Sequence, residues 1–173
     1  MKCLFASLFI LFFMASQAQT TAEEKIKSMG LHLPPVTKPI ANYVKFVKTG
    51  NLIFLSGHGP TKADGTNMMG KVGTDLTDEQ GYEAAKITAL SLIATLKDAL
   101  GGSLIKVKRI VKVNGYVNCG PQFKDHPKII NGCSDLLVAV FGEKGKHARA
   151  AMGMNSLPNN IAVEIEMIVE VED

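Results

Sequence analysis

The end of the chain, residues 161–171, alternates strictly between two kinds of side chain. One set of alternate positions is apolar throughout: Ile161, Val163, Ile165, Met167, Val169 and Val171. The other set is mostly acidic: Ala162, Glu164, Glu166, Ile168 and Glu170. A period of two residues predicts a β-strand that buries one face. The fold must therefore contain a sheet that is covered on at least one side.

Residues 155–160 precede this strand and are rich in Asn, Ser and Pro, which favour turns. We expect this turn to fold the strand back beside residues 148–154 and to bring Glu164 near Arg149. An arginine beside a carboxylate is either a structural ion pair or part of a site for a small acid.

The same two residues also have plainer interpretations. Arg149, taken alone, is compatible with an ordinary surface position, and Glu164 and Glu166 are compatible with a solvated acidic face. In the functional interpretation, the planar fork of Arg149 grips a substrate carboxylate in two hydrogen bonds. Glu164 then orients a water molecule for attack on a C=N bond.

Local patterns predict the other elements. Residues 42–49 and 52–56 read as two strands, and Gly50-Asn51 between them predicts a hairpin turn. A capping box at Thr77-Asp78-Glu79-Gln80 begins a helix that Gly101-Gly102 ends. Residues 105–118 alternate as a further strand, whose predicted buried face is Val107, Val111, Val113 and Val117. Residues 128–141 form a second helix.

The resulting order is strand, strand, helix, strand, helix, strand, strand, which indicates an α+β fold. The economical packing is a mixed β-sheet with both helices on one face. Ile110, Tyr116 and Ile168 would then make the opposite face partly apolar, which favours its burial against another subunit.

The first 18 residues have the pattern of a secretory signal peptide. Lys2 supplies a positive start, residues 4–14 are apolar, and residues 16–18 offer small side chains for cleavage. We expect a soluble mature protein, periplasmic or secreted, with no membrane attachment after cleavage; the alternative is an uncleaved anchor. Residues 19–39 then form a short helix and a Pro-rich linker, and residues 40–173 form one domain.

The composition argues against several classes of protein. A net charge of +3 over 173 residues, without a basic run, does not support nucleic-acid binding. The sequence contains no phosphate-binding glycine motif and no metal-ligand spacing, so we expect no cofactor or metal. Cys119 and Cys133 form either a disulfide or two buried inert thiols, and we prefer the second interpretation. We interpret the four scattered histidines as surface residues: His32, His58, His126 and His147.

Three segments carry a pattern that is known from one protein family. Near the carboxyl end an A-R-A segment precedes a Leu-Pro turn and an E-x-E strand, at residues 148–150, 157–158 and 164–166. Residues 50–57 read GNLIFLSG, and residues 39–44 read PIANYV. Together they resemble the RidA/YjgF family of imine deaminases, also known as L-PSP endoribonucleases. The corresponding family motifs are A-R-[SA], G-N-x-[IL]-x-x-S-G and I-G-P-Y-[VS].

The resemblance implies a chorismate-mutase-like fold, a homotrimer and a site in each cleft between subunits. Arg149 matches the arginine that binds the substrate carboxylate in this family, and Glu164 matches the acid that activates water. The residues that match pocket positions are Tyr43, Ser56, Gly57 and Asn131.

The implied activity is hydrolysis of a small 2-imino or enamino acid to a 2-keto acid and ammonia, without a cofactor. Departures from the family pattern, among them Ala151 in place of a cysteine and His58 in place of a glutamine, indicate a divergent subgroup. A non-catalytic exported trimer that binds a small carboxylate is the alternative. Endoribonuclease activity, which rests on the older family name, is a distant third.

Overall fold

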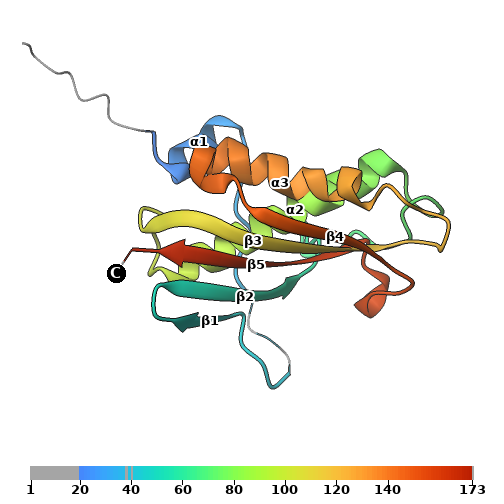
Figure 1. The fold of residues 1–173 in the computed structure, drawn as a ribbon, viewed down its shortest axis with the longest axis horizontal. Coiled ribbons are helices and arrows are strands. Elements are labelled where there is room, and N and C mark those ends of the chain that lie inside the picture. Colours follow the sequence, from blue (N-terminus) through green and yellow to red (C-terminus); the bar gives the residue numbers. More distant parts are fainter. Residues whose placement is uncertain (1–19, 38, 40, 173) are drawn as a thin grey trace, which may run out of the picture.

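The computed structural model describes residues 20–37, 39 and 41–172 (Figure 1). The predicted signal peptide, residues 1–18, lies outside this part of the chain. The elements in order are α1 (Ala22–Ser28), β1 (Phe46–Thr49), β2 (Leu52–His58), α2 (Asp78–Ala99), β3 (Val107–Asn118), α3 (His126–Phe141), β4 (Ala148–Met154) and β5 (Val163–Val171). Two short 3-10 turns, η1 (Gly142–Gly145) and η2 (Pro158–Asn160), flank β4. Of the helices in the described residues, none has both the length and the apolar character needed to span a membrane.

The strands form one sheet in the order β1-β2-β5-β3-β4. β3 and β4 are parallel and every other neighbouring pair is antiparallel, so the predicted mixed sheet is confirmed. The predicted hairpin is also confirmed, because Thr49 pairs with Leu52 across the Gly50-Asn51 turn. Its first strand begins at Phe46, four residues later than expected.

The expectation that β5 returns beside β4 is wrong. β3 lies between these two strands and pairs with both of them. The η2 turn and the residues around it therefore carry the chain past one whole strand before β5 begins (Figure 1).

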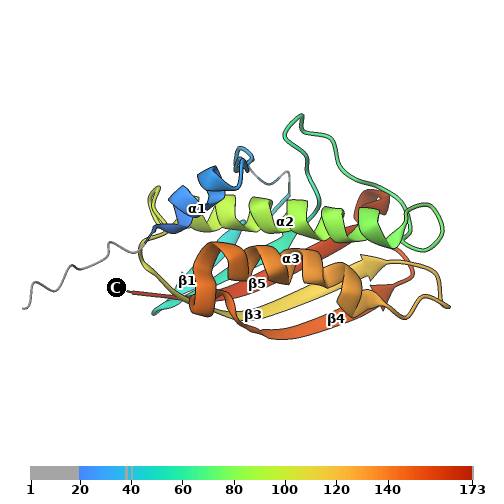
Figure 2. The ribbon, with the colours of Figure 1, turned by 90° about the horizontal axis from the view of Figure 1, so that it is seen from above.

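Helices α2 and α3 lie side by side over one face of the sheet, as expected (Figure 2). We call the covered face the inner face and the opposite one the outer face. The capping box of α2 is present, since the Thr77 hydroxyl accepts from the Gln80 amide and the Gln80 side chain accepts from the Thr77 amide. The inner side of α2 carries a stripe of fully buried residues: Ala85, Ala89, Leu92 and Leu96.

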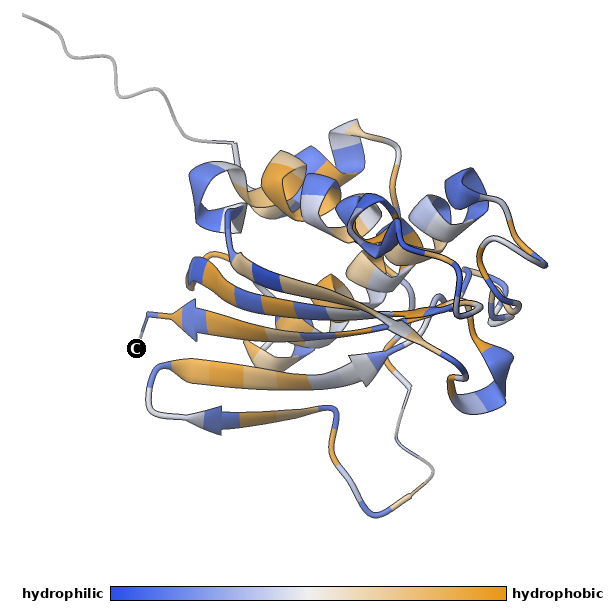
Figure 3. Ribbon diagram, turned by 45° about the vertical axis from the view of Figure 1, so that its right-hand side comes forward, coloured by the Kyte–Doolittle hydropathy of each residue, from blue (hydrophilic) through white to orange (hydrophobic). Residues whose placement is uncertain are grey.

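Apolar and polar residues alternate along the strands (Figure 3). On β5 every second residue from Val163 to Val171 is buried, and the residues between them are half-buried. β3 departs from the simple alternation that we expected. Its register against β5 shifts between Ile110 and Lys112, which is a bulge. Ile110 is therefore completely buried on the inner face rather than exposed, and Val111 lies at the bulge, only half-buried.

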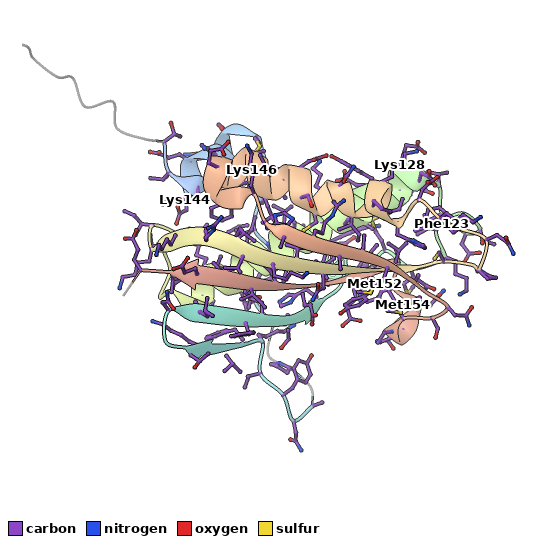
Figure 4. All side chains as sticks on the ribbon, viewed as in Figure 1. Phe123, Lys128, Lys144, Lys146, Met152 and Met154 are labelled. Carbon is purple, nitrogen blue, oxygen red and sulfur yellow. The ribbon has the colours of Figure 1, made fainter. Side chains whose placement is uncertain are left out.

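The outer face is partly apolar. Val47 and Phe54 are 55% and 41% exposed there, beside the half-buried Ile168. Met152 and Met154 lie below β4, on the side away from the helices (Figure 4). Val47, Phe54 and Ile168 line a cavity of about 210 Å³ together with polar side chains, among them Lys112, Asn114 and Glu166.

Candidate functional site

Gly57 on β2 lies directly against Glu164 on β5. The two strands are antiparallel neighbours, and their register shifts between Leu55 and His58, so the backbone at Gly57 bends at this point. A Cβ atom on residue 57 would overlap the Glu164 carboxylate. A glycine here therefore leaves the space that the carboxylate occupies.

The two neighbouring carboxylates of β5 have different surroundings. Oε1 of Glu166 accepts hydrogen bonds from Asn114 Nδ2 at 2.9 Å and from the Tyr116 hydroxyl at 3.1 Å. Among the described residues, no donor forms a hydrogen bond with the Glu164 carboxylate. Burial, and secondarily the negative charge of Glu166, raises the pKa of Glu164 above its ordinary value. A carboxylate that is unbonded and more basic than usual is suited to accept a proton.

Two other predicted site residues are connected to Gly57: Ser56 precedes it on β2, and Tyr43 lies in the segment before β1. The Ser56 hydroxyl donates to the Val44 carbonyl at 2.7 Å, which ties β2 to the segment that carries Tyr43. Tyr43 and Gly57 both line a cavity of about 260 Å³, which also reaches the linker at Pro34–Thr37. Of these three predicted site residues, Gly57 lies against Glu164, Tyr43 shares a cavity with Gly57, and Ser56 lines the outer-face cavity with Glu166.

Arg149 lies in a different place. It is on the edge strand β4, opposite the buried Val113, and its side chain reaches α3. Nη1 of Arg149 donates to Asn131 Oδ1 at 2.8 Å and to Ser134 Oγ at 3.1 Å. Asn131 and Arg149, both implied by the family resemblance, are therefore neighbours.

The expected proximity of Arg149 and Glu164 within one chain is wrong. Strand β3 separates β4 from β5, and Arg149 is directed to the helices whereas Glu164 is directed to the outer face. No ion pair joins the two residues in the described part of the chain. The candidate residues thus form two groups: Arg149 with Asn131, and Glu164 with Gly57, Ser56 and Tyr43.

The interpretation of the histidines as surface residues is wrong for His58, which is 6% exposed. Its Nδ1 bonds the Ser56 carbonyl at 2.7 Å and its Nε2 bonds Thr95 Oγ1, on α2, at 2.8 Å. Burial lowers the pKa of His58 to about 4, so this imidazole is neutral near pH 7. It acts as a fixed support beneath the Ser56-Gly57 bend.

Both cysteines in the described residues are free and buried, as we preferred. Burial raises the pKa of Cys133 to about 12, although the positive charge of Arg149 opposes the shift. A thiol with such a pKa is not a nucleophile at neutral pH. No cluster of three or more metal-binding side chains occurs in the part of the chain that the structure describes.

Two residues near Arg149 were not predicted from the sequence: Ser134 and His147. Ser134 lies three residues after Asn131, so the two share one helix face. That spacing is the only sequence signal that pointed to Ser134.

Comparisons with known proteins place these features in context. A family model described as "YjgF/chorismate_mutase-like, putative endoribonuclease" matches residues 23–171. A relative named Protein TCP17, from Trypanosoma cruzi, is 40% identical over 149 residues, which is 86% of this chain and 92% of the relative. A 2-iminobutanoate/2-iminopropanoate deaminase from Dermatophagoides farinae is 28% identical over 140 residues, covering 80% of this chain and 93% of that enzyme.

Two solved structures are similar to this chain in both sequence and fold. A protein of unknown function from Agrobacterium tumefaciens is 41% identical, with a TM-score of 0.82, over 88% of this chain and 93% of that one. A structure titled as a putative endoribonuclease from Shewanella oneidensis is 33% identical, with a TM-score of 0.83, over 87% and 99% of the two chains.

Proposed function

The chain belongs to the YjgF/chorismate mutase-like family, also called the RidA family, and from this premise we propose that it is an imine deaminase. Its substrate would be a small 2-imino acid, in equilibrium with the enamine. The observation that carries the proposal is the contrast between two carboxylates: Glu166 accepts two hydrogen bonds, whereas Glu164 accepts none from the described residues and has a raised pKa.

The proposed reaction adds water across a C=N bond. Glu164 takes a proton from a water molecule, and the water oxygen bonds to C2 of the imino acid while the nitrogen gains a proton. The resulting carbinolamine loses ammonia when the nitrogen accepts a further proton and the hydroxyl gives one up. The products are a 2-keto acid and ammonia, and no electron is transferred. Glu164 serves first as base and then as acid.

Arg149 would bind the substrate carboxylate. Asn131 and Ser134 hold Nη1, and no hydrogen-bond acceptor for Nη2 or Nε occurs among the described residues. The Nε–Nη2 edge of a guanidinium presents two parallel donors, which suit a carboxylate. This free edge supports the proposal.

Both groups of residues can act on one substrate only if two subunits contribute. We propose that Arg149 of one subunit faces Glu164 and Gly57 of its neighbour in a homotrimer. Support comes from the placement of the two groups on opposite faces of the sheet, and from the partly apolar outer face that a neighbour would cover.

The test is ammonia release from 2-iminobutanoate that an amino-acid oxidase generates in the assay, corrected for spontaneous hydrolysis. We expect the protein to accelerate release, and Glu164→Gln to abolish the acceleration. A rate equal to the spontaneous one at micromolar protein would overturn the proposal. In that case, binding of 2-oxobutanoate without turnover would favour the non-catalytic carboxylate-binding alternative, and cleavage of a single-stranded RNA would favour an endoribonuclease.

A further inference from the structure

Arg149 belongs to a chain of hydrogen bonds that extends away from the free edge of its guanidinium. Ser134 Oγ, which accepts from Arg149 Nη1, lies 3.0 Å from His147 Nε2. His147 Nδ1 lies 2.6 Å from the Gly145 carbonyl oxygen. The chain therefore runs from β4 to α3 and returns to the η1 turn just before β4.

The chemistry of the groups fixes the direction of each hydrogen bond. A carbonyl oxygen only accepts, so His147 Nδ1 must carry the proton. Nε2 of a neutral imidazole is then an acceptor, and the Ser134 hydroxyl must donate to it. Burial, more than the nearby charge of Arg149, lowers the pKa of His147, which favours this neutral form.

With its one proton committed to His147, Ser134 presents only lone pairs to Arg149. Asn131 Oδ1 adds a second acceptor on the same nitrogen. Two acceptors on one nitrogen limit rotation of the guanidinium plane, and so they fix the direction of the Nε–Nη2 edge. Without His147, the Ser134 hydroxyl is free to turn its proton toward Arg149, where it would repel a donor.

We propose that Ser134 and His147 are positioning residues of the carboxylate site. They align Arg149 so that its guanidinium can donate two hydrogen bonds to the carboxylate of the ligand. This inference rests on the proposed role of Arg149 in binding a substrate carboxylate. Neither Ser134 nor His147 touches the substrate. Their effect is on the orientation of Arg149, and hence on how tightly a carboxylate binds.

The variants that test the proposal are Ser134→Ala, which removes the acceptor, and Ser134→Thr, which keeps it. His147→Leu removes the partner of Ser134, whereas His147→Gln retains a donor and an acceptor. We expect the KM for 2-iminobutanoate to rise about tenfold in Ser134→Ala and His147→Leu, as for a lost hydrogen bond to a charged group. The kcat should change less than about twofold, because the carboxylate contact is similar in ground and transition states.

The conservative variants should restore most of the affinity. Ser28→Ala, which removes a hydroxyl that bonds only the Lys25 carbonyl within α1, is the matched control and should leave both constants unchanged. If Ser134→Ala and His147→Leu lower the melting temperature but leave KM unchanged, the two residues merely tie α3 to β4 and the proposal is overturned.

A second measurement separates this inference from the proposed deaminase activity. Calorimetric titration with 2-oxobutanoate, the product, reports carboxylate binding without turnover. If the wild type binds 2-oxobutanoate but does not hydrolyse the imine, the deaminase is refuted, and tenfold weaker binding by Ser134→Ala still supports the positioning role. If the wild type neither binds nor hydrolyses, both proposals fail.

Discussion

Glu164 and Gly57 touch across the β2–β5 pair, and the carboxylate occupies the space that a side chain on residue 57 would fill. Glu164 forms no hydrogen bond with the described residues, and its carboxylate packs closely against the Gly57 backbone. The bend in β2 and the carboxylate on β5 thus depend on each other.

Gly57→Ala should displace the carboxylate and lower activity. The methyl group would meet the end of a flexible side chain, which can rotate away, so the fold should lose little stability. We expect the rate of imine hydrolysis to fall by about tenfold to a thousandfold, which is less than the roughly 10²–10⁴-fold that a positioned general base contributes, because the carboxylate is displaced rather than removed. Gly120→Ala is the matched control, because its methyl would meet only Thr74 Oγ1, at 4.0 Å. Equal activity of both variants would refute the role of the contact.

Glu164→Gln and Glu166→Gln should have opposite effects. Glu164→Gln should remove activity and leave the melting temperature unchanged or slightly raised, because burial of this charge opposes folding at neutral pH. Glu166→Gln weakens the hydrogen bonds from Asn114 and Tyr116 and should cost about 1 kcal/mol of stability. Activity assays and thermal melting on both variants decide this. Loss of activity only in Glu166→Gln would show that Glu166 is the general base and that Glu164 is not.

The sequence allowed the local elements to be predicted, because their signals are local. Alternation along β5 placed Glu164 and Glu166 together on one face, and the capping box fixed the start of α2 at Thr77. Strand order is not a local property. Nothing in residues 148–171 indicates that β3 inserts between β4 and β5, and for this reason the expected pairing of Arg149 with Glu164 was wrong.

The burial of polar residues could not be predicted from the sequence either. His58 is buried because Thr95, on a helix 37 residues later, supplies a partner for its second nitrogen. Ser134 and His147 meet only because η1 turns the chain back along α3. Motif matching identified Arg149 and Asn131, but the residues that support Arg149 required the three-dimensional arrangement.

His58 should make the fold sensitive to acid. Its pKa is about 4 in the folded state against 6.5 as its ordinary value, so the unfolded chain takes up a proton first as the pH falls. The stabilisation is therefore complete above about pH 6.5 and is lost as the pH falls toward 4. The loss amounts to about 3 kcal/mol from this group. Urea denaturation at several pH values measures it.

His58→Gln is the control for this effect. Glutamine does not titrate, so the variant should lose less stability than the wild type between pH 6.5 and 4. His147, whose pKa is also lowered, contributes in the same direction in both proteins and cancels in the comparison. Parallel pH profiles for the two proteins would contradict the burial of a neutral His58.

The outer face should hold the subunits together. Phe54→Asp places a charge among Val47 and Ile168, which line one cavity with it. We expect the wild type to sediment as a trimer at micromolar concentration and Phe54→Asp as a monomer, because an interface cannot bury an unpaired charge. Ile105→Asp, in the loop before β3 and 73% exposed, is the control and should not change the assembly. A monomeric wild type would refute a site shared between subunits.

Arg149 provides the most direct test of the site. Its partners Asn131 and Ser134 are uncharged, so removing the guanidinium leaves no carboxylate without a counter-ion. Arg149→Ala should therefore cost only about 1 kcal/mol of stability, the usual scale for lost hydrogen bonds. Binding of 2-oxobutanoate and imine hydrolysis should fall far more, by about 2–5 kcal/mol in ligand or transition-state binding. Arg149→Lys keeps the charge but loses the paired donors, and should recover only part of the affinity.

The exposed Arg109 on β3 supplies the matched control, since Arg109→Ala removes the same charge at a position that takes no part in the hydrogen bonds of Arg149. Thermal melting, calorimetry and hydrolysis assays on the three variants distinguish the alternatives. If Arg149→Ala melts many degrees below Arg109→Ala while carboxylate binding persists, the arginine is a structural link between β4 and α3. Lost binding with a preserved melting temperature assigns Arg149 to the substrate, because a residue that serves the ligand contributes little to the fold.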